Sequence, residues 1–417
     1  MSDGRAAAPR QGGVSLTLRL LPHALVASTG YVLFAVAALP DLLSARLGIG
    51  LSAFGLLTSA PLGAFVLVQP LASWLSDHRS TARVLLWATA VHIALSVALD
   101  LAGGFATLLA LRFVWGLVAG LVLSVGATHI ARLRRGPAST LEQGVFGGML
   151  TLGGAAAFLF AGPVVAATGG PGLHAVGIGP GLVALACGLR HRRDRRTAPR
   201  SASAGHAPGD PEASADGASG RSTWDTLATV TNPTVLAAGL SYVAVIGSYI
   251  TLSTFITSYF GELGVHGPLN ALVLVGATAG RVSGGVAGWR LRVSDTAFVV
   301  VSVAAGAAGF AALATGPGGW LLVALPFATM VALSVPFGAV FNLAAGATDA
   351  EGVALAAVVA AGNVAALVLP PLAGAIRAAT GGYASVFAML ALLDGVAAAG
   401  VFALARRRDS DGLTENS

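Results

Sequence analysis

The chain has 417 residues, of which 55% are hydrophobic and 10% are charged, whereas soluble globular proteins carry about 25% charged residues. This composition excludes a soluble globular protein, because so few charged groups could not cover its surface. The formal net charge is +6, and every basic residue other than histidine is an arginine. Most of these arginines lie in the tails, in short connections and in one linker, so we expect them to meet anionic lipid headgroups and not nucleic acid.

Twelve apolar runs follow one another along the chain, most of them close to the roughly 20 residues that a spanning helix needs. Their approximate limits are 18–43, 52–75, 84–99, 105–130, 143–167, 173–189, 233–260, 268–288, 296–313, 320–341, 353–376 and 384–405. The pattern predicts an all-α membrane protein with twelve transmembrane helices. The first run is longer than the core of a signal peptide, so we interpret it as an uncleaved span.

The arginines sort to one side of these spans. All 24 lie in the two tails, at the very start of the first run (Arg19) or in every second connection, except Arg46, Arg112, Arg281 and Arg377. Because positive residues stay on the cytoplasmic side, this distribution places both termini in the cytoplasm of a cell-membrane protein.

Residues 190–224 differ abruptly from their surroundings, being rich first in arginine and then in Ala, Ser, Gly and Pro. Such a segment cannot bury apolar surface, and we expect a disordered cytoplasmic linker. It separates a six-helix half at 18–189 from a second at 225–405, with tails at 1–17 and 406–417. Two six-span halves are typical of an internally repeated transporter, which we expect to be a monomer.

The loop after the second span carries the first family motif. The stretch from Ser73 to Arg83 resembles the Gly-x-Leu-Ala-Asp-Arg-x-Gly-Arg-Arg motif of the major facilitator superfamily, with matches at Leu75, Asp77 and Arg83. The resemblance covers nearly the whole chain. It implies two pseudo-symmetric six-helix halves and a conformational switch made by Asp77, Arg79 and Arg83. In this switch the Asp77 carboxylate faces the N-terminus of the eleventh span, where the helix dipole stabilises a negative charge. The alternative is that Asp77 is an acidic residue of a solvated loop without a role in switching.

The fourth span resembles the family's Arg-x-x-x-Gly pattern at Arg112 and Gly116. An arginine within lipid costs about 2.5–3.5 kcal/mol on insertion scales, so it needs a cavity or a partner. In proton-coupled members the matching arginine steers protonation of an acid, which makes Arg112 a candidate coupling charge. The alternative is an arginine whose guanidinium extends to the interface.

The fifth span resembles the family's antiporter motif at Gly153, Gly154, Gly162 and Pro163. Small residues let helices approach closely and proline bends a span. The resemblance implies exchange of a solute against protons. Glycine-mediated packing without any role in coupling is the alternative.

Two further charges lie inside spans. Arg281 in the eighth span is similar to the cavity arginines of nitrate-type porters, although the second span carries Val68 or Gln69 where such porters have a partner arginine. Asp394 is the one acid near a bilayer centre and is a functional candidate by default. The alternative is an Asp capped by a polar group of a neighbouring helix, and the same alternative applies more strongly to His92.

Candidate residues for a substrate cavity are aromatic or polar side chains of the central spans: Tyr31, Phe34, Tyr242, Tyr249 and Asn363. Together these features predict a secondary transporter that expels a small organic solute in exchange for protons. The alternative is an uptake porter for a small anion, either nitrate, nitrite or cyanate or an organic acid. Neither a catalytic cluster, a metal-ligand spacing nor a phosphate loop is present in the sequence, so we expect no enzyme and no cofactor. The single Cys187 excludes a disulfide within the chain.

Overall fold

The computed structural model describes residues 16–133, 137–169, 172–197, 223–265, 267–291 and 293–414, and every regular element within these ranges is helical. Eleven segments in them are long and apolar enough to cross a membrane. They are formed by α1 (Leu16–Phe34), α3 (Leu51–His78), α4 (Thr81–Asp100), α5 (Phe105–Leu133), α6 (Pro137–Thr168), α9 (Pro233–Glu262), α10 (Ala271–Leu291), α11 (Asp295–Ala314), α12 (Leu321–Ser334) with α13 (Phe337–Ala345), α14 (Glu351–Thr380) and α15 (Ala384–Thr414).

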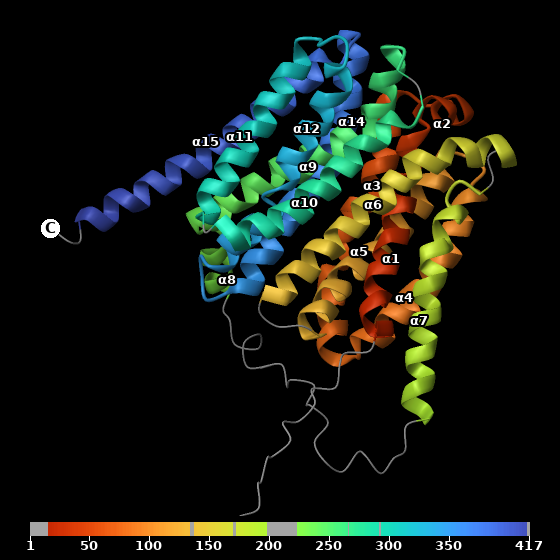
Figure 1. The fold of residues 1–417 in the computed structure, drawn as a ribbon, viewed down its shortest axis with the longest axis horizontal. Helices are drawn as coiled ribbons and strands as arrows, with labels where there is room; N and C mark the ends of the chain where they lie inside the picture. The colour runs from red at the N-terminus through yellow and green to blue at the C-terminus, as the bar shows by residue number, and fades with distance from the viewer. Residues whose placement is uncertain are drawn as a thin grey trace, which may run out of the picture.

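The sixth span of the predicted twelve corresponds to α7 (Ile178–Thr197), which packs along α1 and α4 (Figure 1). Its apolar part is short because the helix continues into the arginines that follow Leu189. Two short helices mark the ends of the bundle. The α2 helix (Pro40–Leu47) lies at one end, together with the α14–α15 turn, and α8 (Thr223–Val230) lies at the opposite end. We refer to these as the α2 end and the α8 end.

Two predicted boundaries are wrong. The first span does not continue to residue 43, because α1 ends at Phe34 and Pro40 starts α2. The residue before a proline avoids the helical region, and Leu39 has φ −134° and ψ 55°. The linker does not begin at 190, because arginine is a good helix former and α7 extends to Thr197. Most of the linker, residues 198–222, lies outside the described residues.

The two halves repeat one packing scheme. In the N-terminal half, α1 packs on α6, α3 on α5 and α4 on α7. The C-terminal half reproduces these contacts between α9 and α14, α10 and α12, and α11 and α15. Across the halves, the second span of each packs on the fifth span of the other, as α3 with α14 and α10 with α6. This exchange of equivalent pairs confirms the predicted pseudo-symmetric fold.

The halves touch backbone to backbone near the α2 end. A Cβ atom on Gly55 would lie 2.6 Å from the carbonyl group of Pro370, and one on Gly374 would lie 2.5 Å from the carbonyl oxygen of Leu51. Only glycine permits such an approach of α3 to α14. The bundle is therefore closed at the α2 end.

Candidate functional site

Arg281 lies where the two halves meet. Its side chain extends from α10 and is 6% exposed. Its Nη1 donates to the carbonyl oxygen of Gly147 on α6, in the other half, at 2.9 Å. Its Nε is buried without a hydrogen-bond partner. No carboxylate in the described parts of the chain forms an ion pair with it. The guanidinium thus carries a positive charge that the protein itself leaves incompletely matched.

Aromatic rings cover the guanidinium. Its Cζ lies 4.6 Å from the ring centroid of Phe337 on α13 and 5.1 Å from that of Tyr249 on α9. Rings within about 6 Å attract a cation through their negative faces, by roughly 0.5–2 kcal/mol. The ring of Phe34 on α1 meets Tyr249 edge to face at 5.9 Å. The hydroxyl of Tyr249 is buried and has no partner.

The ring cluster continues toward the α8 end through Tyr242, whose centroid lies 6.0 Å from Phe337 and 5.1 Å from Phe341. Gly362 makes room for Tyr242, since a Cβ there would overlap its ring. Of the predicted cavity residues, the structure therefore brings Phe34, Tyr242 and Tyr249 together around Arg281. We call Arg281, Tyr249, Phe337 and Phe34 the central site.

Two predicted cavity residues take other positions. The Tyr31 ring packs under the α6–α7 connection, where a Cβ on Gly177 would overlap it, so it lies apart from the central site. Asn363 follows Gly362 on α14, and its Nδ2 donates to Val359 one turn earlier at 3.0 Å. Part of its hydrogen-bonding capacity is therefore used within its own helix.

Arg112 is fully buried, and each of its three side-chain nitrogens donates to a backbone carbonyl group. Its Nε donates to Leu57 at 2.5 Å, its Nη2 to Leu33 at 2.9 Å and its Nη1 to Val32 at 3.3 Å. Each of these carbonyl groups lacks its usual helical donor. Val32 and Leu33 belong to the last turn of α1, and residue 61, four after Leu57, is a proline. Arg112 thus joins α5 to α1 and α3 and is occupied by this structural role.

Glycines on the same face of α5 complete that contact. A Cβ on Gly116 would lie 2.5 Å from the Cα of Pro61, and one on Gly120 would lie 2.9 Å from the Cα of Phe65. Arg112, Gly116 and Gly120 are spaced by one helical turn and therefore share one face. The Arg-x-x-x-Gly pattern of the fourth span places α5 directly against the proline-containing turn of α3.

The fifth-span glycines divide into two groups. A Cβ on Gly153 would overlap the carbonyl oxygen of Ala27 on α1, and one on Gly154 would meet Phe34 and Leu274. Near Gly162, in contrast, a Cβ would meet no atom within 4 Å, and Pro163 is exposed on the protein surface. Gly153 and Gly154 are packing positions, whereas the Gly-Pro pair lies away from the interface between the halves.

The predicted switch residues lie at the α3–α4 turn. Asp77 accepts from Nη2 of Arg132 on α5 at 3.4 Å, and its side chain is 51% exposed. Arg132 also donates to the carbonyl oxygen of Ser76 at 2.6 Å, so it caps the end of α3. Arg79 and Arg83 are exposed. In this conformation Asp77 pairs within its own half and not with the N-terminus of α14.

His92 is satisfied by its neighbours in a way that fixes its tautomer. The indole Nε1 of Trp115 can only donate, so His92 Nδ1 accepts its bond at 3.1 Å. Nε2 therefore carries the hydrogen and donates to Ser28 at 2.8 Å, and Ser28 donates to Gly177. A second proton on His92 would oppose the indole hydrogen. The chain of bonds makes His92 a structural residue.

Asp394 on α15 is buried with only half of its carboxyl group satisfied. Its Oδ1 accepts from Ser248 on α9 at 2.8 Å, and its Oδ2 has no partner. The adjacent residue on α9 is Tyr249 of the central site, so α9 contacts both intramembrane charges, Arg281 and Asp394. The sequence indicated Asp394 through its charge, but the pairing with Ser248 depends on how α9 and α15 are rotated.

Comparison with known proteins supports this architecture. The sequence pattern of the Major Facilitator Superfamily matches residues 20–359. The fold is similar to two crystal structures of a bacterial homologue of the human lysosomal transporter Spinster, both inward-facing. The unoccupied one gives a TM-score of 0.67 at 16% identity over 94% of this chain and 98% of the other. The occupied one gives 0.65 at 16% identity over 93% and 96%.

No curated protein matches the sequence. The match of the family pattern nevertheless extends over most of the chain and reaches into both halves, and the helix arrangement agrees with it. This chain therefore belongs to the Major Facilitator Superfamily of membrane transporters.

Proposed function

We propose that this protein is a secondary transporter that moves a small organic anion across the cell membrane by alternating access, with Arg281 binding the negative charge. The observation that carries the proposal is the buried guanidinium of Arg281 with an unpartnered Nε at the junction of the halves. A buried charge is costly unless it is paired, so a negatively charged ligand would supply the missing interaction.

The surroundings of Arg281 favour an organic anion over an inorganic one. Phe337, Tyr249 and Phe34 offer apolar faces next to the cation, and the Tyr249 hydroxyl is a further free polar group. Binding sites for small molecules typically combine such an apolar lining with a few polar anchors. Nitrate, nitrite or cyanate would use the charge of Arg281 but not the rings. Transport of such an inorganic anion is the alternative.

Alternating access fits the way the halves meet. The glycine contacts between α3 and α14 close the α2 end, and the Asp77 carboxylate is half exposed near the opposite end. The distribution of arginines supports an assignment of the α8 end to the cytoplasm. We propose that Asp77 approaches the N-terminus of α14 when the transporter closes there and opens at the α2 end.

Efflux and exchange against protons stay predictions. The Gly162–Pro163 pair suggested them, but a Cβ on Gly162 would meet nothing, and Pro163 faces outward. The support for an anion site is independent of this pair, because it comes from Arg281. Superfamily members are transporters and are not enzymes in general, in agreement with a binding role for these residues.

Ligand binding to purified protein in detergent tests the proposal, with benzoate as the organic anion, nitrate as the inorganic anion and benzylammonium as the cation. A ligand that binds only the folded state raises its melting temperature. We expect benzoate to stabilise the wild-type protein. In Arg281→Ala, loss of a charged hydrogen bond should weaken benzoate binding by about 10- to 100-fold, because such bonds contribute about 1.5–3 kcal/mol.

The matched control is Val282→Ala, which changes the neighbouring, 37% exposed residue of α10 and should bind benzoate like the wild type. Equal stabilisation by benzylammonium, or undiminished benzoate binding in Arg281→Ala, would contradict an anion site at Arg281. Stronger stabilisation by nitrate than by benzoate would favour the inorganic-anion alternative.

A further inference from the structure

Most serines and threonines in the middle of α9 donate hydrogen bonds. Those bonded to the carbonyl group one turn earlier, at 2.7–2.9 Å, are Ser241, Thr251 and Thr254. Ser248 donates to Asp394. The hydroxyls of Tyr249 and Ser253, in contrast, are buried and have no partner. A buried polar group without a partner costs free energy, so each of these two hydroxyls requires an explanation.

The two free hydroxyls lie on one face of α9, because Tyr249 and Ser253 are four residues apart. The ring of Tyr249 contacts Arg281 on α10 at 5.1 Å and Phe34 on α1 at 5.9 Å, so this is the face that meets the central site. Ser253 is fully buried one turn further toward the α2 end. The central site and its continuation along α9 thus contain two hydroxyl groups that bind nothing in the protein.

The threonine hydroxyls nearest to Arg281 are bonded to each other. Thr278 lies three residues before Arg281 on α10 and hydrogen-bonds Thr151 of α6 at 2.7 Å. Each of these two hydroxyls also lies 2.9 Å from a carbonyl oxygen of its own helix. A hydroxyl carries one hydrogen and a carbonyl oxygen only accepts, so the pair uses both of its hydrogens internally. Tyr249, unlike this pair, still has a hydrogen to donate to a ligand.

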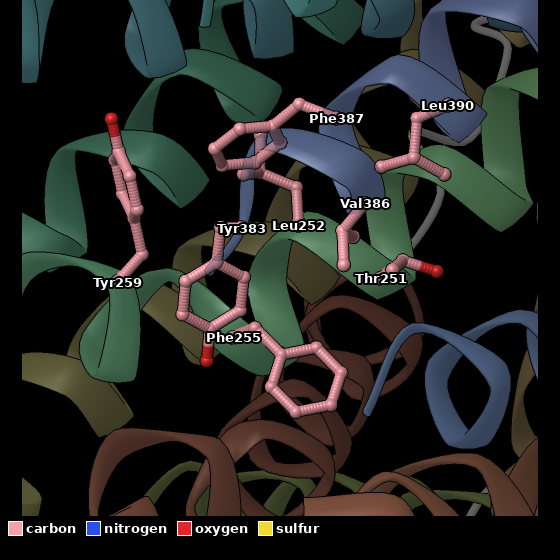
Figure 2. Close-up of a pocket in the computed structure, with 8 residues that line it drawn as sticks. All are labelled: Thr251, Leu252, Phe255, Tyr259, Tyr383, Val386, Phe387 and Leu390. Atoms are coloured by element: carbon pink, nitrogen blue, oxygen red, sulfur yellow. The ribbon is translucent and has the colours of Figure 1, made fainter. Parts of the chain in front are cut away.

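The opposite face of α9 offers no comparable site. Thr251, Phe255 and Tyr259 lie on that face, because two residues advance about 200° around a helix from Tyr249 or Ser253. There they line a cavity of about 10 Å³ between α9 and α15 (Figure 2). A cavity of this size holds at most one water molecule, so it cannot admit an organic anion. The free hydroxyls of α9 therefore belong to the central site and not to the contact with α15.

Other tyrosines with free hydroxyls do not lie next to an unpaired charge. The hydroxyls of Tyr31 and Tyr383 are also buried without a partner. Tyr31, however, lies apart from the central site. The ring of Tyr383 lies 5.4 Å from Arg377, but that arginine forms an ion pair with Glu262. Among the tyrosines that the structure describes, Tyr249 alone combines a free buried hydroxyl with contact to an arginine that has no carboxylate partner.

We propose that the hydroxyls of Tyr249 and Ser253 bind a second polar group of the transported anion, which is therefore an organic acid with a hydroxyl or carbonyl oxygen apart from its carboxylate. This inference rests on the proposed transport function and narrows its substrate class. Arg281 binds the carboxylate, the rings of the central site cover the apolar part, and the two hydroxyls bond the second oxygen. Such a site rejects an analogue that lacks this oxygen, because its own hydroxyls then stay buried without a partner.

Ligand pairs that differ in one hydroxyl test the proposal on the full-length protein in detergent. Dissociation constants are measured for 3- and 4-hydroxybenzoate and for 3- and 4-methylbenzoate, in which a methyl group takes the place of the hydroxyl. We define the hydroxyl preference as the dissociation constant of the methyl compound divided by that of the hydroxy compound. Tyr249→Phe should lower this preference about 2- to 12-fold for at least one ring position, which corresponds to the contribution of one hydrogen bond.

Tyr31→Phe is the matched control, because Tyr31 and Tyr249 are both 3% exposed and both have a hydroxyl without a partner. It removes the same atom outside the central site and should leave the hydroxyl preference at the wild-type value. A preference that is unchanged in Tyr249→Phe, or that falls equally in Tyr31→Phe, would overturn the proposal.

The melting temperature of the ligand-free protein separates a binding role of Tyr249 from a structural one. Tyr249→Phe removes no hydrogen bond from the ligand-free protein, so it should melt at the wild-type temperature or above it. A lower melting temperature would mean that the hydroxyl supports the fold, which would overturn its role in binding.

Ser253→Ala tests the second hydroxyl and should also lower the hydroxyl preference. Its matched control is Ser241→Ala, which changes a serine of α9 whose hydroxyl is bonded within the helix and should leave the preference unchanged. Equal preferences in these two variants would exclude Ser253 from the site.

Failure of this proposal can be distinguished from failure of the proposed function. If Arg281→Ala abolishes benzoate binding but Tyr249→Phe leaves the hydroxyl preference unchanged, only the second polar group is defeated. If benzoate binding persists in Arg281→Ala while Tyr249→Phe lowers the preference, only the role of Arg281 is defeated.

Discussion

Gly153→Ala is expected to destabilise the protein strongly, whereas Gly162→Ala in the same helix is expected to leave stability unchanged. A Cβ at position 153 would overlap the carbonyl oxygen of Ala27, and one at position 162 would meet nothing within 4 Å. Backbone atoms cannot move aside as a flexible side chain can, so α1 and α6 must separate. Overpacking of this kind costs about 1–3 kcal/mol, and we expect the upper part of that range.

Melting temperature in detergent measures this difference, and the two variants control for each other because both change glycine to alanine in α6. Gly30 provides an independent check from the other side, since a Cβ there would overlap the carbonyl oxygen of Leu150. Gly30→Ala should therefore resemble Gly153→Ala. Equal stability of the Gly153 and Gly162 variants would contradict the close packing of α1 on α6.

Arg112→Ala is expected to have the largest effect on folding of any single change in a charged residue. It would leave the carbonyl groups of Leu57, Val32 and Leu33 buried without a donor. Each unsatisfied group costs about 1–3 kcal/mol, so we expect a loss of at least about 3 kcal/mol. Arg112→Lys should recover only part of it, because an ammonium group cannot reproduce the planar arrangement of donors.

The second buried arginine is the matched control. Arg281 donates to one backbone carbonyl group, so Arg281→Ala should reduce stability much less than Arg112→Ala while it removes anion binding. Unfolding by denaturant and benzoate binding, measured on both variants, separate the two roles. Equal losses of stability would mean that the hydrogen bonds of Arg112 do not support the fold as described.

The sequence was sufficient to predict most of the fold. Apolar runs and the sorting of arginines indicated twelve spans in two halves, because burial in lipid leaves a direct record in composition. Two ends were missed for local reasons. The run from 18 to 43 is mostly apolar, so hydropathy does not show that the first helix ends within it. The only local sign is Pro40, which restricts the backbone of the residue before it. At α7, helix propensity extends the helix past the point where hydropathy falls.

The central site was only partly predictable. Arg281, Phe34, Tyr242 and Tyr249 could be selected by residue type, but Phe337 takes its place beside Arg281 through the break between α12 and α13. Tyr31 resembles its neighbours in sequence yet packs under Gly177, because helix rotation decides which side chains face the cavity. The role of Arg112 depends on the carbonyl group of Leu57 in α3, which has no helical donor because residue 61 is a proline. The sequence of α5 alone contains no sign of this contact.

Uptake of radiolabelled benzoate into proteoliposomes measures whether Arg281 binds a transported anion. We expect saturable uptake by the wild-type protein and by Val282→Ala, and loss of that uptake in Arg281→Ala at similar levels of folded protein. Uptake that is equal in Arg281→Ala and the wild type would contradict the claim that this arginine binds the transported anion.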